Sequence, residues 1–490
     1  MATNVMTNHE SVFIGGDWVL PATPDRIEVV SPWSEDVIAT VPSGSREDVD
    51  RAVAAARQAL EAGPWPSMSL PERVAILERL RELLVERSEE LAQLITAEMG
   101  CPITQSRNSQ VVNPIGILDA YLQTAETYPF RTVRRSVNGQ ALVTRAPVGV
   151  VAAVVPWNVP ASLTAQKIVP ALLAGCTVVL KPAPETPLDA YFVARLLSEA
   201  GLPPGVVNVV PADREVSEYL VSHPGVNKVT FTGSSAAGRR IAEISAQDLR
   251  RVTLELGGKS AAVILSDADL DLAVSALRVG SFRNNGQVCS LKTRLLVPST
   301  MEGEFLDRLN AMIDTMPIGD PRDETTQIGP LVSARQRERV EDYIAAGTAE
   351  GARLVRGGRR PPGLEKGWFV EPTVFTGVDP NATIAQEEIF GPVVSVIPYQ
   401  TEDEAIAIAN NSNYGLNGSV FTSDIERGLL VAGRMQTGTV ELNGNPAGFR
   451  APMGGVKLSG LGREFGPEGI DAYVELKSIG IPKELADSLQ

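Results

Sequence analysis

Beyond residue 148, the chain alternates short runs of continuous apolar residues with longer segments of helical periodicity. Such runs are typical of strands buried on both faces, and they cover 150–155, 177–180, 206–210 and 228–232. Helical periodicity covers 161–173, 189–200, 215–221 and 238–246. Strands separated by helices in this order predict a parallel α/β sheet. A second α/β unit is expected from about 260 to 443, beginning with a strand at 261–265 and a helix at 270–279.

The part of the chain before residue 148 follows other patterns. Residues 11–43 are typical of short extended pieces joined by turns, and helical periodicity covers 46–62, 71–99 and 111–127. Residues 131–146 form two alternating runs around Asn138-Gly139, a dipeptide that favours a tight hairpin turn. Because this hairpin is polar on both faces, it either packs on another chain or lies solvated at a sheet edge, and the pattern alone favours neither.

Length and charge limit the fold and the partners. A chain of 490 residues is expected to hold about three domains. Its net charge of −15 argues against partners that need a basic surface, namely nucleic acids and anionic membranes. The most apolar region, 148–180, is interrupted by prolines and polar residues, so no membrane span is expected. Residues 1–10 have neither a basic start nor an apolar core, so we expect no signal peptide and a cytoplasmic location.

Cysteine and histidine usage narrows the chemistry. The cysteines, Cys101, Cys176 and Cys289, are far apart and odd in number, which indicates free thiols in a reducing compartment. The only histidines are His9 and His223. The chain therefore has too few histidines to favour a serine–histidine triad, a cysteine–histidine pair or a histidine-bound zinc site. If the chain is an enzyme, its base is a carboxylate, a lysine or a metal-bound water.

Cys289 is the cysteine with the most suggestive surroundings. It lies in the stretch Ser-Phe-Arg-Asn-Asn-Gly-Gln-Val-Cys-Ser at 281–290. Gly286, three residues earlier, lets the backbone turn sharply and can present the sulfur to a cleft. Taken alone, the stretch fits a reactive thiol and a buried structural cysteine equally well.

Two other segments are candidates for binding a nucleotide. Residues 233–238 connect a predicted strand to a predicted helix and have the outer glycines of a dinucleotide-binding turn, with serine at the middle position. A phosphate could bind the free N–H groups of the helix start and the hydroxyl of Ser234. Lys181 ends an apolar strand, where ligands of parallel sheets bind, although a surface lysine that caps the strand is the commoner case.

Asn158 and Glu255 are candidates for catalysis. Asn158 lies between two prolines and can donate to a developing oxyanion, although asparagine more often caps a helix. Glu255 alternates onto the strand face opposite Leu254 and directly precedes two glycines. That face is either solvated, or it approaches other backbone closely and gives Glu255 the raised pKa of a general base.

Together these segments resemble the NAD(P)-dependent aldehyde dehydrogenase superfamily, of its hydrolytic, non-acylating type. The resemblance covers nearly the whole chain and rests on motifs in a fixed order: Pro-Trp-Asn at 156–158, Lys-Pro at 181–182, Phe-Thr-Gly-Ser at 231–234, Leu-Glu-Leu-Gly-Gly-Lys at 254–259, Gly-Gln-Val-Cys at 286–289, Glu-Ile-Phe-Gly-Pro at 388–392, Pro-Met-Gly-Gly-Val-Lys at 452–457 and Ser-Gly at 459–460. It implies oxidation of an aldehyde to a carboxylic acid with hydride transfer to NAD or NADP, through a thiohemiacetal and a thioester on a cysteine.

The resemblance also implies a role for each motif residue. Cys289 is the expected nucleophile and Glu255 the base that activates water. Asn158 and the backbone N–H of Cys289 are expected to bind the oxyanion, and Glu464 matches a family carboxylate thought to assist proton transfer. No metal ligand is expected. The residues expected to bind the cofactor are Val155, Pro156, Trp157, Lys181, Gly233, Ser234, Leu256, Glu388 and Phe390.

Two positions depart from the family pattern. Many members have glutamate three residues after the lysine, where it binds the adenosine ribose, whereas this chain has Pro184 there and Glu185 one residue later. A carboxylate at that place repels a 2′-phosphate, so its displacement here weakens the distinction between NAD and NADP. NAD is expected because it is the commoner cofactor of the family, and NADP stays possible. Ser235 replaces a frequent threonine and keeps the hydroxyl.

The fold that the resemblance implies is a Rossmann-like cofactor domain plus an α/β catalytic domain with a small β oligomerisation arm. The expected dinucleotide-binding domain comprises 1–127 and 148–257, the catalytic domain 258–460, and the arm 128–147 and 461–490. The arm favours packing of the hairpin on another chain, and a homodimer or homotetramer is expected. The substrate is an unidentified aldehyde, expected to contact loops at 103–124, 285–292 and 444–451.

Two other functions are weighed against hydrolytic oxidation. A CoA-acylating aldehyde dehydrogenase transfers the thioester to CoA and typically lacks a base at the position of Glu255. A catalytically inactive structural homologue would be expected to lose Cys289 or Glu255. The presence of both residues disfavours each alternative.

Overall fold

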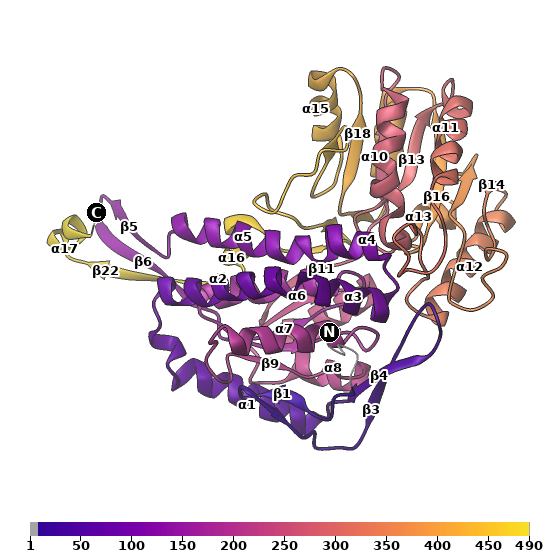
Figure 1. Ribbon diagram of the computed structural model, residues 1–490. Coiled ribbons are helices and arrows are strands. Elements are labelled where there is room, and N and C mark those ends of the chain that lie inside the picture. The colour runs from indigo at the N-terminus through magenta and orange to yellow at the C-terminus, as the bar shows by residue number, and fades with distance from the viewer. Residues whose placement is uncertain (1–7, 490) are drawn as a thin grey trace.

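The computed structural model describes residues 8–489. These residues form two halves, each built around one large β-sheet, and a β-arm extends from one of the halves (Figure 1). The expectation that residues 1–10 form no signal peptide concerns a segment of which residues 1–7 lie outside the described residues. No helix within residues 8–489 is long and apolar enough to cross a membrane.

An eight-stranded sheet forms the centre of the lower half in Figure 1, in the order β2-β1-β9-β8-β7-β10-β11-β21. Strands β9, β8, β7, β10 and β11 run parallel, while the β2-β1-β9 and β11-β21 pairings are antiparallel. The strands are β1 Val12–Ile14, β2 Asp17–Val19, β7 Val150–Val154, β8 Thr177–Lys181, β9 Val207–Val209, β10 Lys228–Thr232, β11 Arg251–Glu255 and β21 Gly460–Leu461. Central strands such as β7, whose sequence is Val-Val-Ala-Ala-Val, are buried throughout because apolar side chains fill both faces. The predicted parallel α/β sheet is confirmed.

Helices cover both faces of this sheet. One face carries α2 Leu70–Glu86, α3 Ser88–Met99, α5 Val112–Thr127, α6 Pro160–Ala174 and α7 Leu188–Glu199. The other face carries α1 Arg46–Glu61, α8 Arg214–Ser222 and α9 Ser235–Gln247. The predicted helical segments are all found, but 71–99 is two helices rather than one, because Arg87 leaves the helical conformation at φ −112° and ψ 24°. Glu89 and Glu90 then lie in the first turn of α3, where carboxylates favour a helix start.

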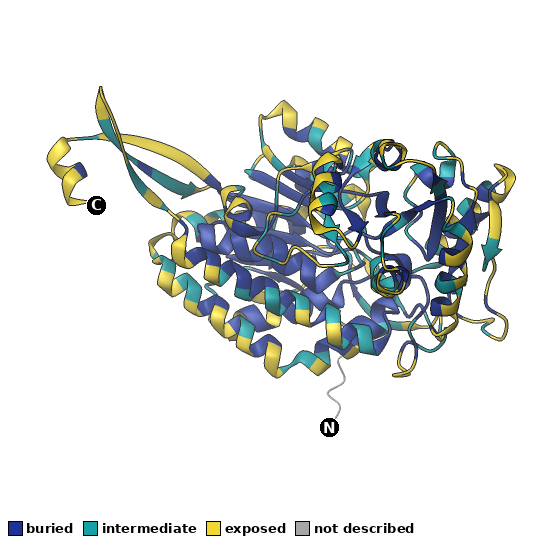
Figure 2. Ribbon diagram, turned by 90° about the horizontal axis from the view of Figure 1, so that it is seen from above, coloured by how far each residue is buried: buried dark blue, intermediate teal, exposed yellow. Residues whose placement is uncertain are grey.

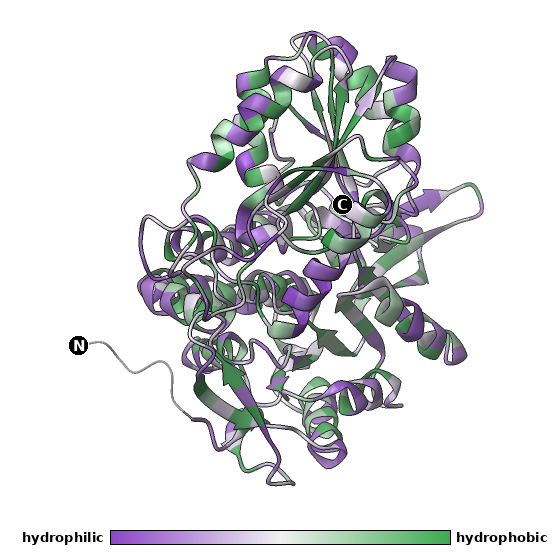
Figure 3. Cartoon of the chain, turned by 90° about the vertical axis from the view of Figure 1, so that its right-hand side faces the viewer, coloured by the Kyte–Doolittle hydropathy of each residue, from purple (hydrophilic) through white to green (hydrophobic). Residues whose placement is uncertain are grey.

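A seven-stranded sheet forms the upper half, in the order β14-β15-β16-β13-β12-β18-β19. All of its pairings are parallel except β14-β15. The strands are β12 Ser260–Ile264, β13 Lys292–Pro298, β14 Arg353–Arg356, β15 Thr373–Thr376, β16 Val393–Tyr399, β18 Gly418–Phe421 and β19 Glu441–Leu442. One face is covered by α10 Leu270–Phe282 and α11 Glu302–Asp314, and the other by α12 Ala334–Ala349, α14 Glu402–Asn410 and α15 Ile425–Arg434. Figure 3 shows apolar residues concentrated on the strands at the centres of the two halves.

The arm is a three-stranded antiparallel sheet in the order β22-β6-β5. Its strands are β5 Arg131–Ser136, β6 Gly139–Pro147 and β22 Val474–Ile481, followed by α17 Lys483–Ser488. The predicted Asn138-Gly139 hairpin is confirmed, and the C-terminal strand pairs along it from Val474 opposite Pro147 to Ile481 opposite Gln140. Figure 2 shows that the arm is exposed along most of its length.

Short elements complete the chain. They are the hairpin β3 Arg26–Val30 and β4 Val37–Pro42, the pair β17 Tyr414–Gly415 and β20 Val456–Lys457, the short turns of helix η1 Trp65–Ser67, α4 Ile103–Gln105, η3 Arg283–Gly286, α13 Thr383–Gln386 and α16 Gly466–Asp471, and one turn of π-helix, η2 Ser106–Gln110. A π-turn is rare and often occurs at functional sites, and this one lies directly before α5.

Candidate active site

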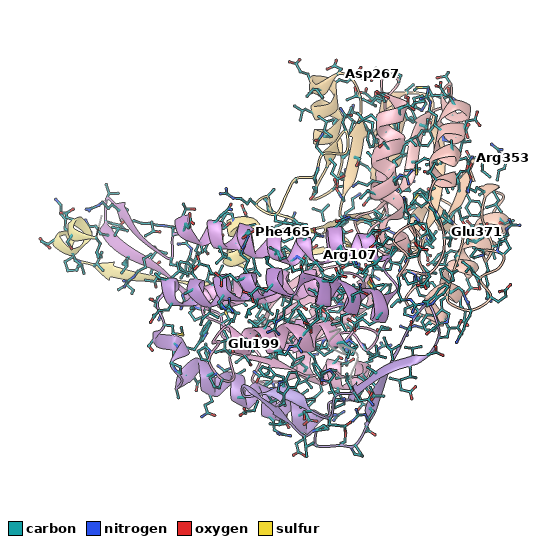
Figure 4. The ribbon with its side chains drawn as sticks, in the orientation of Figure 1. Arg107, Glu199, Asp267, Arg353, Glu371 and Phe465 are labelled. Carbon is teal, nitrogen blue, oxygen red and sulfur yellow. The ribbon has the colours of Figure 1, made fainter. Side chains whose placement is uncertain are left out.

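A cavity of about 1460 Å³ lies between the two halves, at the carboxyl ends of the parallel strands of the first sheet. Its wall combines η2 and α5, the segments that follow β7, β10 and β11, the η3 turn, and α12. In Figure 4, Arg107 and Phe465 lie on the side of the lower half that faces the upper half. Ligands of parallel α/β sheets bind at these strand ends, so this cavity is the candidate active site.

Cys289 lies on the cavity wall after a turn with an unusual backbone. Asn284 and Asn285 have positive φ angles of 53° and 58°, and Gly286 follows with φ 79°. A Cβ on Gly286 would lie 2.1 Å from the carbonyl carbon of Gly391, so only glycine fits there. The Asn285 side chain holds the turn by accepting from the Gly329 N–H at 2.6 Å and donating to the Pro330 carbonyl at 2.7 Å. The sharp turn predicted before Cys289 is confirmed.

Cys289 is half-buried on the cavity wall and has negatively charged neighbours. Burial and, to a smaller extent, the carboxylates of Glu388 and Glu255 raise the pKa of Cys289 to about 12. Arg283, six residues earlier, acts in the opposite direction. Without a bound ligand, the protein therefore holds this residue as the neutral thiol at pH 7.

Asn158 is fixed beside Cys289 on the same wall. It is buried, and its side-chain Nδ2 donates to the carbonyl of Gln287 at 3.0 Å, which uses one of its two N–H groups. Its backbone carbonyl accepts from Gln110 at 3.1 Å and from Asn284 at 2.8 Å. These bonds tie the segment after β7 to both η2 and the η3 turn, so the Asn158 side chain is held in position on the wall that also carries Cys289.

Glu255 ends β11 and is buried under the cavity rather than on its wall. Neither carboxylate oxygen has a hydrogen-bond partner within residues 8–489, and one rests against Gly454. Burial raises the pKa of Glu255, and the charge of Glu464 raises it further. The solvated-face alternative for Glu255 is therefore wrong, because its strand is covered by β21 and by the loop that contains Gly454.

Glu464 lies next to Glu255 and is paired with a lysine. Its Oε1 lies 2.8 Å from Nζ of Lys167, and both side chains are buried. The second oxygen of Glu464 has no partner in the described part of the chain. The motifs do not single out Lys167, although a lysine within the fully buried helix α6 is a signal that could have identified it.

Most residues expected to bind the cofactor lie on one part of the wall: Pro156, Trp157, Gly233, Ser234, Leu256, Glu388 and Phe390. Ser234 caps α9 and accepts from the Ala237 N–H, so its hydroxyl proton and the free N–H groups of the helix start stay available to an anion. Val155 and Lys181 lie behind the wall. Burial lowers the pKa of Lys181 to about 8, with the charges of Glu185 and Asp213 opposing the shift.

Glu388 has close backbone neighbours. It accepts from the Gly258 N–H at 3.0 Å, and a Cβ on Gly257 would lie 2.3 Å from its other oxygen, so the two glycines make room for this carboxylate. Burial raises its pKa to about 7. Phe390 has a positive φ of 62°, and its ring lies edge-on to Trp157 with 5.3 Å between the centroids.

The loops expected to contact the substrate also reach the cavity. Segment 103–124 contributes Gln105, Asn113 and Ile117, and segment 444–451 contributes Phe449. Gln110, at the end of the π-turn 106–110, belongs to segment 103–124 and lines the cavity as well. Cys101 and Leu163 also line it, although sequence patterns do not identify them as wall residues.

Comparison with known proteins gives consistent matches. The aldehyde dehydrogenase family model matches residues 18–479. The chain is 46% identical over 473 residues to geranial dehydrogenase of Castellaniella defragrans, covering 96% of this chain and 98% of that protein. It is 42% identical over 476 residues to 3-succinoylsemialdehyde-pyridine dehydrogenase of a Pseudomonas species, covering 97% and 99%.

Solved structures match as closely. An aldehyde dehydrogenase of Mycobacterium tuberculosis complexed with NAD+ superposes with a TM-score of 0.96 at 47% identity, covering 97% of this chain and 99% of that one. A mutant of aldehyde dehydrogenase C from Pseudomonas syringae, complexed with NAD+ and octanal, superposes with a TM-score of 0.94 at 43% identity, covering 96% and 97%.

Proposed function

The chain belongs to the aldehyde dehydrogenase family, and we propose that it oxidises an aldehyde to the carboxylic acid through a thioester on Cys289. One observation carries the proposal. The carbonyl of Gln287, two residues before Cys289, holds the Asn158 amide, so a nucleophile and an oxyanion donor face one cavity from a rigid turn. Attack on a carbonyl carbon needs these two groups on the same side of it.

NAD is the proposed cofactor, in line with the NAD+ complexes of similar structures. The residues present fit such a dinucleotide: the start of α9 at Ser234 presents free N–H groups to a pyrophosphate, and the carboxylate of Glu388 suits a ribose hydroxyl. Lys181 is proposed to hold the other ribose. When bound, NAD accepts the hydride that leaves the substrate. Glu185 lies 3.4 Å from Arg335, so the charge of its carboxylate is partly neutralised. Activity measured with NAD and with NADP tests the choice between the two cofactors.

The first step is attack of the Cys289 thiolate on the aldehyde. The sulfur bonds to the carbonyl carbon, and the resulting oxyanion accepts hydrogen bonds from the Asn158 side chain and the Cys289 backbone N–H. Each such donor is worth about 3 kcal/mol in the transition state. When the hydride leaves, the carbonyl re-forms and a thioester remains on Cys289. The raised pKa of the thiol means that the proton must be removed before attack.

Hydrolysis of the thioester is assigned to Glu255. A carboxylate without hydrogen-bond partners and with a raised pKa is a suitable base for water. Because Glu255 rests against Gly454 behind the wall, its side chain must turn toward the cavity to act. Glu464 and Lys167 lie next to it, and the carboxylate of Glu464 is proposed to receive the proton while the acid and the thiolate are released.

Assembly is proposed to use the arm. The exposed side chains of Leu476, Ile479 and Leu485 lie on β22 and α17, and apolar side chains there favour contact with a second copy of the chain. A homodimer or homotetramer is proposed on this basis. The domain limits 1–127 with 148–257, 258–460, and 128–147 with 461–490 are also proposed, and the cytoplasm remains the expected location.

The decisive experiment compares the wild type with Glu255→Gln. Each enzyme is mixed with octanal and NAD without CoA, and the protein is quenched and digested for mass spectrometry. We expect octanoic acid from the wild type and, in the variant, an octanoyl group retained on the peptide that contains Cys289. An acyl group on another residue contradicts the nucleophile assignment. A parallel reaction contains CoA, and turnover that requires CoA and yields octanoyl-CoA in place of octanoic acid supports the acylating alternative.

A further inference from the structure

Gln166 is a polar residue of the cavity wall that the proposed chemistry leaves unused. It lies in α6, a helix in which every residue is buried, and it lines the cavity with 4% of its surface exposed. The only polar contact of its amide in the described chain is a weak one of 3.9 Å, from Nε2 to the sulfur of Met453. An amide side chain has two donors and two acceptor sites, so this one is almost entirely unpaired.

The other glutamines of the wall are held by the protein itself. Each of them makes a hydrogen bond of between 2.6 and 3.1 Å to a nitrogen or an oxygen of the described chain: Gln105, Gln110, Gln327 and Gln336. Within residues 8–489, Gln166 is thus the glutamine of this wall whose amide lacks such a bond. A buried amide without a partner is costly, and a ligand group that pairs with it compensates this cost.

The neighbours of Gln166 on the wall are apolar. Leu163 lies one turn earlier on the same helix, and Met453 contacts the amide through its sulfur. Lys167, the next residue along α6, does not line the cavity, and it is paired with Glu464 at 2.8 Å. Among these residues a charged group of a ligand would meet no free counter-charge. A hydroxyl both donates and accepts, as the amide does, so a hydroxyl is the ligand group that matches Gln166.

We propose that Gln166 binds a hydroxyl group on the chain of the substrate, so that the preferred substrates are hydroxyaldehydes. This inference rests on the proposed function, because the aldehyde end must meet Cys289. Helix α6 begins at Pro160, two residues after Asn158, and Gln166 lies six residues further along, a rise of about 9 Å. Its side chain leans back toward the start of the helix. The hydroxyl is therefore expected several carbon atoms away from the aldehyde carbon.

The test compares hexanal and octanal with their terminal hydroxy derivatives. In the wild type, kcat/KM is expected to be higher for the hydroxyaldehyde than for the alkanal in at least one of the two pairs. In Gln166→Met, which keeps the length of the side chain, kcat/KM for that hydroxyaldehyde should fall by about 3- to 10-fold, the range for a neutral hydrogen bond. The value for the parent alkanal should fall by no more than about twofold, because an alkanal chain makes no bond to the amide.

Gln327→Met is the matched control, because Gln327 also lines the cavity but its amide is bound by Arg278 at 2.6 Å. Its ratio of hydroxyaldehyde to alkanal kcat/KM should equal that of the wild type. Both members of a pair are measured on one preparation, so any unfolded fraction cancels in this ratio.

A wild type that prefers the alkanal in both pairs overturns the proposal. An equal loss for both members of a pair in Gln166→Met, the result of a purely structural role, overturns it too, as does an unchanged ratio. If no enzyme and no substrate gives NADH, the proposed function itself has failed.

Discussion

Two arginines of the upper half, Arg283 and Arg294, show how differently the protein treats buried polar groups. Arg294 lies in β13, and its guanidinium donates to the backbone carbonyls of Lys259, Ile408 and Ala409, each at 2.8 Å. It joins the start of β12 to the end of α14 and does not line the candidate active-site cavity. Arg283 lies on the wall of that cavity, and its Nε has no hydrogen-bond partner in the described part of the chain. Arg294 therefore stabilises the fold, whereas the guanidinium of Arg283 is left largely unpaired at the cavity.

The same contrast holds for the carboxylates. Glu98 is buried and accepts from the backbone N–H groups of Leu188 and Asp189 at 3.0 and 3.2 Å, so it fixes the start of α7. Glu255 is buried to a similar degree, yet it accepts no hydrogen bond from any described residue. Burial raises the pKa of both groups. Burial alone thus does not identify a functional carboxylate, and neither do missing partners, because both oxygens of the buried Asp189 also lack a hydrogen-bond partner in the described chain. Glu255 is distinguished by its position, since Leu256 and Gly257 directly after it line the cavity.

The substitution Cys289→Ala, in the cavity, is expected to have the largest effect of all, a loss of activity. Loss of the nucleophile should lower kcat by at least about 10⁴-fold, as for other covalent catalysts. The melting temperature should change by less than about 2 °C, because no hydrogen bond that holds the turn involves the thiol. NADH absorbance and thermal unfolding measure the two effects. Cys176→Ala, at a buried cysteine away from the cavity, is the control. Activity of Cys289→Ala within tenfold of the control would contradict the assignment.

The substitution Arg294→Met is expected to have the next largest effect, a loss of stability. Three buried carbonyls lose their donor, and at about 1–3 kcal/mol each the free energy of unfolding should fall by about 3 kcal/mol or more. Urea unfolding measures this change. The kcat of the folded enzyme at 25 °C should stay within about threefold of the wild type. Arg308→Met, at an exposed arginine paired with Glu304, should change stability much less. An unchanged midpoint in Arg294→Met would refute the structural role.

The smallest effect is a pH dependence of the cavity groups. The pKa of Cys289 and that of Glu255 are both raised, and the active forms are the thiolate and the carboxylate. Both forms therefore increase with pH, and kcat/KM should rise from pH 6 to pH 9 by up to about tenfold per unit. The pH–rate profile of the wild type with pentanal measures this. A profile that is flat or falls over this range is incompatible with the two assignments.

The sequence determined the α/β class and the hairpin of the arm, and it supplied the candidate site residues. Continuous apolar runs such as 150–155 favour strands buried on both faces, because a half-exposed strand alternates. Asn138-Gly139 fixes a tight turn through its backbone preferences. The near absence of histidine restricted the expected base to a carboxylate, a lysine or a metal-bound water, and the ordered motifs predicted Cys289, Glu255 and Asn158 as site residues. These properties depend on the local chain, so local patterns reveal them.

Only the tertiary structure decided which polar atoms are left without partners. The break at Arg87, the π-turn that brings Gln110 to the wall, and the Lys167–Glu464 pair depend on packing between distant segments. Glu255 behind the wall and Arg283 on it are equally polar in the sequence. Their difference arises because hydrogen-bond satisfaction depends on neighbours that lie up to two hundred residues away, such as Gly454 for Glu255.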